Sequence, residues 1–219
     1  MNVALIGASG FVGARILEEV LSRGHRVTAL VRKPDALPSH PNLTARSVDV
    51  LDSAALAAAA AGHDAVISAY NPGRAVPGGD EVTAQHKAGH RAIIDGVKQS
   101  GVTRFLAVGG AASLKTREGV EFLDSPEFPQ EFEPYKGGVR GTRALYYLLK
   151  DEPSLDWVFV APSVFLRPGE RTGKFRLGKD HVLYDADGNS HISLEDYAVA
   201  MIDELERPAH HRERITVGY

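Results

Sequence analysis

The chain has 219 residues, of which 43% are hydrophobic and 24% charged, and its formal net charge is −3. This composition is typical of a globular protein and excludes collagen-like and disordered classes. The small negative charge argues against nucleic acid or an anionic membrane as the main partner and favours a small-molecule ligand. The sequence has no cysteine, which excludes disulfides, thiolate nucleophiles and zinc–cysteine sites.

The N-terminal run from Met1 to Gly7 is apolar over only a few residues. It is too short for the hydrophobic region of a signal peptide or for a membrane span, so we expect a cytoplasmic protein. A chain of this length can form one α/β unit with a sizeable core. Since no Pro-rich or Gly/Ser-rich linker divides it, we expect a single domain over residues 1–219.

Short apolar runs alternate with longer amphipathic stretches along the chain. The runs predict buried strands at Val3–Ile6, Val27–Val31, Leu43–Val48, Ala65–Ala69, Phe105–Val108 and Trp157–Ala161. The stretches between them predict crossover helices at Phe11–Arg23, Ser53–Ala61 and Val82–Gln99. Near-continuous apolar strands are typical of a parallel sheet that is covered on both faces. The sequence therefore predicts an α/β, Rossmann-like, doubly wound and mostly parallel sheet with helices on both faces.

The end of the chain predicts one more helix and one more strand. Ser193 precedes Leu194-Glu195-Asp196 as a helix N-cap would, and the helix is expected to run to about Glu206. A closing strand is expected at Arg214–Val217. Three loops, at about 71–79, 116–134 and 162–190, follow predicted strands. In a doubly wound sheet such loops gather at the carboxyl ends of the strands, so we expect them on the substrate side.

A glycine-rich turn, Gly7-x-x-Gly10-x-x-Gly13, follows the first strand and opens the first helix. One glycine would permit a tight turn with positive φ, one would let the backbone approach a pyrophosphate, and the last would let the helix lie close to the strand. The helix N-terminus would then receive the phosphates. The turn therefore predicts a dinucleotide site, although a tight turn without a ligand is the alternative. The candidate contacts also include Ser9, Phe11 and Val12.

The second strand ends in Arg32 and Lys33, where the adenosine ribose of a dinucleotide would lie. An arginine offers a planar donor fork that matches a 2′-phosphate, so NADP(H) is the expected cofactor. If both residues are ordinary solvated charges, NAD(H) could serve as well. Asp49 and Val50, after the third strand, are candidates for contacting the adenine; alternatively Asp49 caps its own loop.

Several motifs together resemble those of the atypical short-chain dehydrogenase/reductases, and in particular the NmrA-like, biliverdin reductase B-like group that is often described as NADH-flavin reductases. The resemblance covers essentially the whole chain. It implies a Rossmann-like fold with an NAD(P) site and, in several relatives, reduction of flavins or tetrapyrroles. Besides the glycine turn, the motifs are Val31-Arg32-Lys33-Pro34, Asp49-Val50-Leu51-Asp52, Val108–Ser113, Asp156–Pro162 and Ile192–Ala198.

The sequence departs from the Tyr-x-x-x-Lys pair with which ordinary members of that family move a proton. Counting forward from Tyr135 gives Val139, and counting back from Lys136 gives Phe132. We favour Lys136 as a retained ribose-binding lysine with Phe132 in the tyrosine position, while a surface helix lysine is the alternative. Tyr135 is a candidate for a substrate-side hydroxyl.

Further candidates follow other strands. Ser113 is placed to hydrogen-bond the substrate or the nicotinamide, because the sequence shows no neighbouring base to make it a nucleophile; the alternative is a cap or loop serine. Two loops are expected around the nicotinamide and its ribose, unless each is only a turn. The candidate cofactor contacts on these and neighbouring strands are Ala69, Tyr70, Asn71, Gly109, Pro162 and Ser163.

Two other patterns concern histidines and acidic residues. His86 and His90 stand four apart on a predicted helix, but no third ligand is obvious, so we expect a solvated helix face and no metal. The run from Glu118 to Glu133 holds six acidic residues without Lys or Arg. It also contains Phe122, Phe128 and Phe132, so it predicts either a lid whose aromatic rings stack on a flat substrate or a plain exposed loop.

These patterns together predict an NAD(P)H-dependent oxidoreductase that prefers NADPH and transfers a hydride to a planar acceptor such as a flavin or a quinone. Such acceptors can take their proton from solvent, so the missing tyrosine is tolerable. The alternative is a non-enzymatic NADP(H)-binding sensor or regulator of NmrA type, for which the same missing pair argues. Monomer and homodimer are both compatible with the sequence.

Overall fold

The computed structural model of the chain describes residues 1–72 and 78–219. Its centre is a sheet with the strand order β3-β2-β1-β4-β5-β6-β10-β8, in which neighbours are parallel except β10 and β8. Its strands are β1 (Asn2–Ile6), β2 (Arg26–Val31), β3 (Leu43–Ser47), β4 (Ala65–Ser68), β5 (Arg104–Val108), β6 (Asp156–Pro162), β8 (Arg176–Gly178) and β10 (Glu213–Gly218). The order reverses between β1 and β4, which is where doubly wound sheets open a crevice for ligands.

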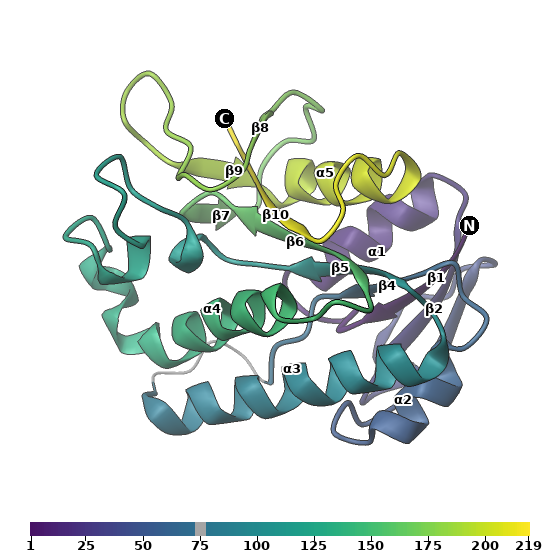
Figure 1. Cartoon of the computed structure of the whole chain (residues 1–219). Helices are drawn as coiled ribbons and strands as arrows, with labels where there is room; N and C mark the ends of the chain where they lie inside the picture. Colours follow the sequence, from purple (N-terminus) through teal and green to yellow (C-terminus); the bar gives the residue numbers. More distant parts are fainter. Residues whose placement is uncertain (73–77) are drawn as a thin grey trace.

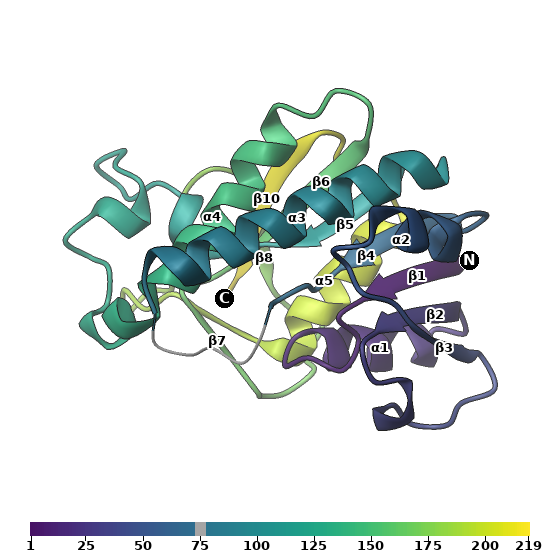
Figure 2. The same ribbon diagram turned by 90° about the horizontal axis from the view of Figure 1, so that it is seen from below.

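Helices cover both faces of this sheet (Figure 1). On one face α1 (Gly13–Ser22) packs beside α5 (Leu194–Glu206). On the other, α3 (Asp80–Ser100) lies between α2 (Ser53–Ala60) and α4 (Lys136–Lys150), as the view from below shows (Figure 2). The predicted Rossmann-like fold is therefore confirmed. No helix in residues 1–72 and 78–219 is long and apolar enough to cross a membrane.

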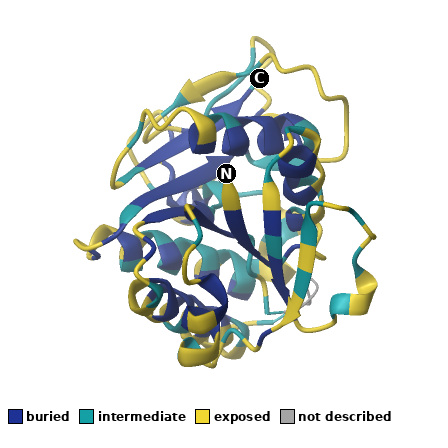
Figure 3. Cartoon of the chain, turned by 90° about the vertical axis from the view of Figure 1, so that its right-hand side faces the viewer, coloured by how far each residue is buried: buried dark blue, intermediate teal, exposed yellow. Residues whose placement is uncertain are grey.

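The core lies along the central strands and the inner helix faces (Figure 3). Phe105 on β5 and Phe159 on β6 are fully buried, and burying one such side chain contributes about 1.5–3 kcal/mol. Tyr197 on α5 is also fully buried, and its hydroxyl donates a 2.7 Å hydrogen bond to the carbonyl of Val160. Ser193 caps α5, as predicted, by accepting a hydrogen bond from the backbone N–H of Asp196.

Three expectations about secondary structure need correction. The third strand was expected to be buried, yet β3 lies at the sheet edge and alternates between half-buried and exposed residues. The segment 162–190 is not only loop, since it contains β8 and also β7 (Phe165–Arg167), which pairs with β9 (His191–Ser193) in a separate parallel sheet. The segment 116–134 contains 3-10 turns. Within the described residues, the 3-10 helices are Pro34–Ala36, Ala111–Ser113, Phe122–Asp124 and Gln130–Tyr135.

The helix α4 was not among the expected crossover helices. Three glycines near its start weaken the helical signal, but two of them are required for packing. A methyl group at Gly137 would place its carbon 2.3 Å from the carbonyl oxygen of Gly79, and one at Gly141 would come 2.3 Å from the Cβ of His86. These glycines let α4 lie close against α3 and the residues that precede it.

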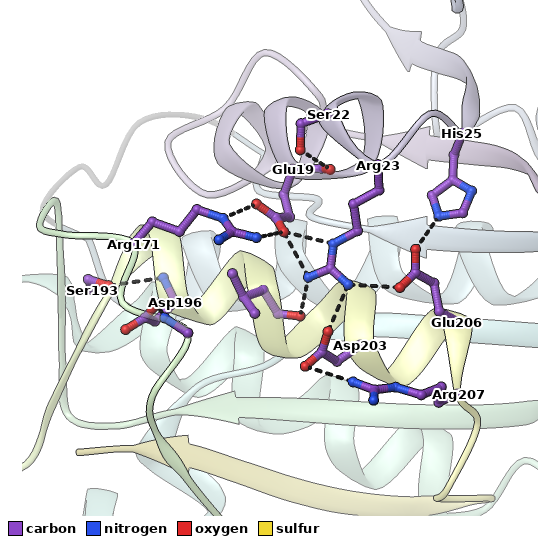
Figure 4. Close-up of polar contacts among 12 residues, drawn as sticks. Glu19, Ser22, Arg23, His25, Arg171, Ser193, Asp196, Asp203, Glu206 and Arg207 are labelled. Carbon is purple, nitrogen blue, oxygen red and sulfur yellow. Dashed lines mark hydrogen bonds and ion pairs between the residues drawn. The ribbon is translucent and has the colours of Figure 1, made fainter.

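A network of ion pairs ties the segment after β7 to both helices of the α1 and α5 face (Figure 4). At its centre is Glu19, only 5% exposed, which accepts hydrogen bonds from Arg171 at 2.7 Å and 2.8 Å and from Arg23 at 2.8 Å. Arg23 also reaches Asp203 and Glu206 on α5. The hydrogen bonds from Arg171 are the largest cause that lowers the pKa of Glu19, so the carboxylate is held in its charged form.

Candidate cofactor and acceptor site

The glycine-rich turn has the conformation that its sequence predicts. Gly7 has a φ of +77°, which side chains rarely adopt, and a methyl carbon there would lie 2.5 Å from the carbonyl oxygen of Ala69. A methyl carbon on Gly13 would lie 2.1 Å from the carbonyl oxygen of Gly7. Gly10 closes the turn through a 2.9 Å hydrogen bond from its N–H to the same oxygen. The turn can therefore form only with glycine at both ends.

The N-terminus of α1 fits a phosphate group. The residue at its N-cap, Val12, makes no side-chain cap hydrogen bond, and the first turn of the helix holds no acidic residue. The N–H groups of Ala14, Arg15 and Ile16 donate to the carbonyls of Gly10 and Val12, so the N–H groups just before them, from Phe11 to Gly13, are the ones left for an anion, and the helix dipole favours one. Ser9 and Phe11 are exposed beside it. These features fit the pyrophosphate of a dinucleotide.

The end of β2 fits the adenosine half of a dinucleotide. Arg32 and Lys33 are exposed, and in the described ranges neither forms an ion pair. Burial raises the pKa of the Tyr70 phenol. The positive charge of Arg32 lowers this pKa, and the negative charge of Asp49 raises it. The three side chains therefore lie near one another at the carboxyl ends of neighbouring strands, around the point where the strand order reverses.

Asp49 also caps its own loop, because its Oδ1 accepts a 3.0 Å hydrogen bond from the N–H of Leu51. Val50 is half-buried, whereas Leu51 is 60% exposed although it is a large apolar residue. An exposed leucine beside the end of β3 offers a face to a flat base such as adenine. Leu51 was not singled out in the sequence as a contact, although it stands in a motif that carries the family resemblance.

A pocket of about 340 Å³ opens at the carboxyl ends of β5 and β6, within the size range of small-molecule sites. All three loop regions expected on the substrate side contribute to its walls, although residues 73–77 of the first lie outside the described part of the chain. Its lining comprises Asn71, Pro72, Val82, Gln85, His86, Gly109, Gly110, Ala111, Ala112, Phe122, Phe128, Phe132, Tyr135, Gly138, Val139, Thr142, Pro162, Ser163, Val164 and Leu166.

One wall of this pocket is aromatic. Phe122 and Phe128 have ring centroids 6.1 Å apart, Phe128 and Phe132 6.2 Å, and Phe132 and Phe165 5.6 Å. Tyr135 lines the pocket as well. We name the set Phe122, Phe128, Phe132 and Tyr135 the aromatic wall. Its rings can stack on a planar ligand.

The acidic residues of the same segment are largely paired. Arg143 on α4 binds Glu121 at 2.9 Å and Asp124 at 2.5 Å, and Tyr147 donates a hydrogen bond to Glu121. Tyr184 donates one to Glu127. These contacts fix the segment against α4 and the region before β9. The segment is therefore an ordered wall, which favours the ring-stacking expectation over a plain exposed loop.

The predicted catalytic residues lie at different distances from the pocket. Tyr135 lines it and is 37% exposed. Lys136 does not line it: its Nζ pairs with Glu133 at 2.8 Å and stands 5.3 Å from the centre of the Phe128 ring. Ser113 is buried and does not line the pocket, although its neighbour Ala112 does, and its Oγ has no hydrogen-bond partner in the described residues. Their chemical roles stay predictions.

The remaining predicted contacts surround the pocket and the glycine turn. Gly109 must be glycine, because a methyl carbon there would lie 2.4 Å from the Phe159 ring. Pro162 and Ser163 line the pocket, and the Ser163 hydroxyl donates to the carbonyl of Val217 at 3.1 Å. Ala69 contacts the turn through its backbone. Asn71 lines the pocket too.

The expectation that His86 and His90 form a solvated helix face is wrong. Each is only 3% exposed, and their ring centroids are 5.8 Å apart. Tyr70 covers His90 edge-on at 5.3 Å, and α4 covers His86 at Gly141. No group of three His, Cys, Asp or Glu residues in the described ranges is arranged to hold a metal ion. The sequence signal that could have indicated the burial of His86 is the unusual glycine content of α4, which lets α4 lie close to α3.

Comparisons with known proteins agree with this geometry. A family model described as NAD(P)H-binding matches residues 7–208. The chain belongs to this NAD(P)H-binding family. A nicotinamide cofactor and an oxidoreductase type of fold are thereby supported, and the resemblance to the atypical short-chain dehydrogenase/reductases is confirmed.

Three relatives are similar over almost their full length. The chain is 39% identical to the uncharacterized protein YwnB of Bacillus subtilis over 220 residues, which is 99% of this chain and 98% of that protein. It is 46% identical to a "putative epimerase" of Bacteroides thetaiotaomicron, with a TM-score of 0.90 and coverage of 100% and 96%. It is 32% identical to a "putative NADH-flavin reductase" of Streptococcus pneumoniae, with a TM-score of 0.81 and coverage of 100% and 99%.

Proposed function

We propose that this chain is a reductase that prefers NADPH and transfers a hydride to a planar aromatic acceptor such as a flavin or a quinone. The observation that carries the proposal is the aromatic wall, which faces a pocket at the carboxyl ends of β5 and β6. A nicotinamide held by the glycine turn would supply the hydride there. The flavin reductase name of the Streptococcus pneumoniae relative supports the same class of acceptor.

The protein's own part is to position the reactants. The glycine turn and the N-terminus of α1 would hold the pyrophosphate, and Arg32 would hold the 2′-phosphate. The aromatic wall would orient the acceptor by stacking. In the alignment that we favour, Phe132 takes the position of the tyrosine of related enzymes and has no proton to give, so an acceptor that takes its proton from water suits this site.

The test is a titration of the purified protein with NADPH and NADH, followed by addition of FMN, riboflavin or a quinone while the nicotinamide absorbance is recorded. We expect tighter binding of NADPH and steady oxidation with at least one of these acceptors. Binding without oxidation would contradict the reductase, and equal binding of the two dinucleotides would contradict the preference.

We expect Arg32→Ala to weaken NADPH binding by about 1–3 kcal/mol, because a charge-assisted hydrogen bond to the 2′-phosphate is lost. NADH binding should change much less, since NADH lacks that phosphate. Both affinities are measured by nicotinamide fluorescence. The matched control is Arg26→Ala, an exposed arginine at the opposite end of β2, which should change neither affinity. Equal losses for both dinucleotides in Arg32→Ala would refute the assignment.

A second candidate function is a sensor that binds NADP(H) without turnover. Two observations favour it. Lys136 pairs with Glu133 and does not line the pocket, and the Tyr-x-x-x-Lys pair that moves a proton in ordinary members of the family is missing. The titration above distinguishes the two, because a sensor would bind NADPH tightly and leave it unoxidised with every acceptor.

A further inference from the structure

His86 carries a polar group that the proposed function does not use. It lines the pocket from α3 although the residue is only 3% exposed. Its Nδ1 is buried and has no hydrogen-bond partner among the described residues. Its Nε2 lies next to Gly138, another lining residue, where a methyl carbon would stand 3.5 Å away. The imidazole therefore presents one nitrogen to protein and the other toward the pocket.

The surroundings of His86 keep its imidazole neutral. Gly141 of α4 closes over its Cβ, and the ring of His90 lies 5.8 Å away. Burial lowers the pKa of His86. Burial and the neighbouring His86 lower the pKa of His90 to about 3. A neutral imidazole carries one N–H, so the position of that proton decides what His86 can do.

The proton is expected on Nε2. Buried N–H groups without an acceptor are rarer in proteins than buried acceptors without a donor. Since Nδ1 is buried without a partner, the better tautomer leaves Nδ1 as an unprotonated nitrogen. The N–H then lies on Nε2, on the side of the pocket.

Other side-chain donors of the pocket are already committed or solvated. Thr142 donates to the carbonyl of Gly138 at 3.2 Å, and Ser163 donates to the carbonyl of Val217. Tyr135 and Gln85 are exposed to water. His86 thus combines a buried ring with a proton that no described group accepts. Such a donor is stronger in a dry site than in water and needs no reorganisation.

We propose that the Nε2–H of His86 hydrogen-bonds the oxygen or nitrogen of the acceptor on which negative charge develops during reduction. This inference rests on the proposed function and narrows its substrate class to acceptors with a ring carbonyl or ring nitrogen, such as quinones and flavins. The acceptor gains a hydride with its electron pair from C4 of the dihydronicotinamide, whose C–H bond breaks to leave the oxidised pyridinium. The resulting anion takes a proton from water, while His86 stays neutral and keeps its own.

The test compares two variants that differ in the ability to donate. His86→Leu removes the donor, and His86→Gln can place an amide N–H near the position of Nε2. With menadione or FMN as acceptor, we expect His86→Leu to lower kcat about a hundredfold, as does the loss of one hydrogen-bond donor from the oxyanion hole of other enzymes. His86→Gln should retain at least tenfold more of that kcat, and the dissociation constant for NADPH should stay within about twofold in both. Thermal unfolding shows that each variant folds.

The matched control is His90→Gln, a buried histidine one turn further along the same helix that does not line the pocket. It should leave kcat and KM within about twofold of the original protein. Equal losses of kcat in His86→Leu and His86→Gln, or a similar loss in His90→Gln, would overturn the donor role, because they indicate a packing effect.

A second readout does not depend on turnover. In protein labelled with 15N in histidine, the His86 ring should show the Nε2–H tautomer, and its Nε2 signal should shift when menadione or FMN is added. A His86 signal that does not respond to any acceptor overturns the inference. If NADPH is never oxidised but the signal shifts, the proposed reductase fails while the contact with His86 stands.

Discussion

Gly13→Ala is expected to abolish measurable binding of NADPH and to lower the free energy of unfolding by about 2–3 kcal/mol. The added methyl carbon would lie 2.1 Å from the carbonyl oxygen of Gly7. Neither atom belongs to a flexible side chain, so α1 must move away from β1. That movement displaces the helix N-terminus from the position where it would receive a phosphate.

The two effects of Gly13→Ala are measured by nicotinamide fluorescence and by urea unfolding followed with circular dichroism. Gly24→Ala, just past the other end of α1, is the matched control. Gly24 has a φ of +80° but open space around it, so a substitution should cost about 1 kcal/mol through backbone strain and leave NADPH affinity unchanged. Unaltered NADPH binding by Gly13→Ala would show that this turn is not the cofactor site.

Glu19→Ala is expected to lower the free energy of unfolding by about 2–3 kcal/mol. The substitution removes a buried carboxylate that binds both Arg23 and Arg171. Arg23 keeps Asp203 and Glu206 as partners, and Arg171 can turn to water. The loss of stability is therefore smaller than when a substitution leaves a buried charge without any partner. The neighbouring Glu18→Ala is the control, since Glu18 is exposed and its removal should cost at most about 0.5 kcal/mol.

The effect of Glu19→Ala should depend on pH. The pKa of Glu19 is lowered from 4.5 in the folded protein, so its contribution to stability is present above that unfolded value and is lost as the pH falls through the lower folded value. Urea unfolding at a series of pH values should show the difference between the two proteins shrinking below about pH 4.5. A difference that stays constant into strong acid would mean that packing, not charge, explains the loss.

Much of the fold could be predicted because it depends on local patterns. The strands β1, β2, β4, β5 and β6 are mostly apolar runs, and the positive φ of Gly7 follows from a turn that only glycine can make. Ser193 caps α5 through contacts within three residues. In each case the residues that decide the structure are neighbours in the sequence.

The remaining features depend on partners far away in the chain. β3 is half-exposed because the strand order leaves it at the sheet edge. His86 is buried because Gly141, 55 positions later, lets α4 lie on top of it. The expectation of a solvated helix face came from α3 alone and could not include that contact. Lys136 lies outside the pocket because Glu133 and Phe128 hold it.

The aromatic wall has a consequence for how the range of acceptors can change. Phe122, Phe128, Phe132 and Tyr135 all come from one continuous stretch that is held by its own contacts to Arg143 and Tyr184. The glycine turn lies more than a hundred residues earlier and, within residues 1–72 and 78–219, shares no hydrogen bond or ion pair with that stretch. Under the proposed function, exchanging this one stretch between relatives is therefore expected to change the choice of acceptor while dinucleotide binding is retained.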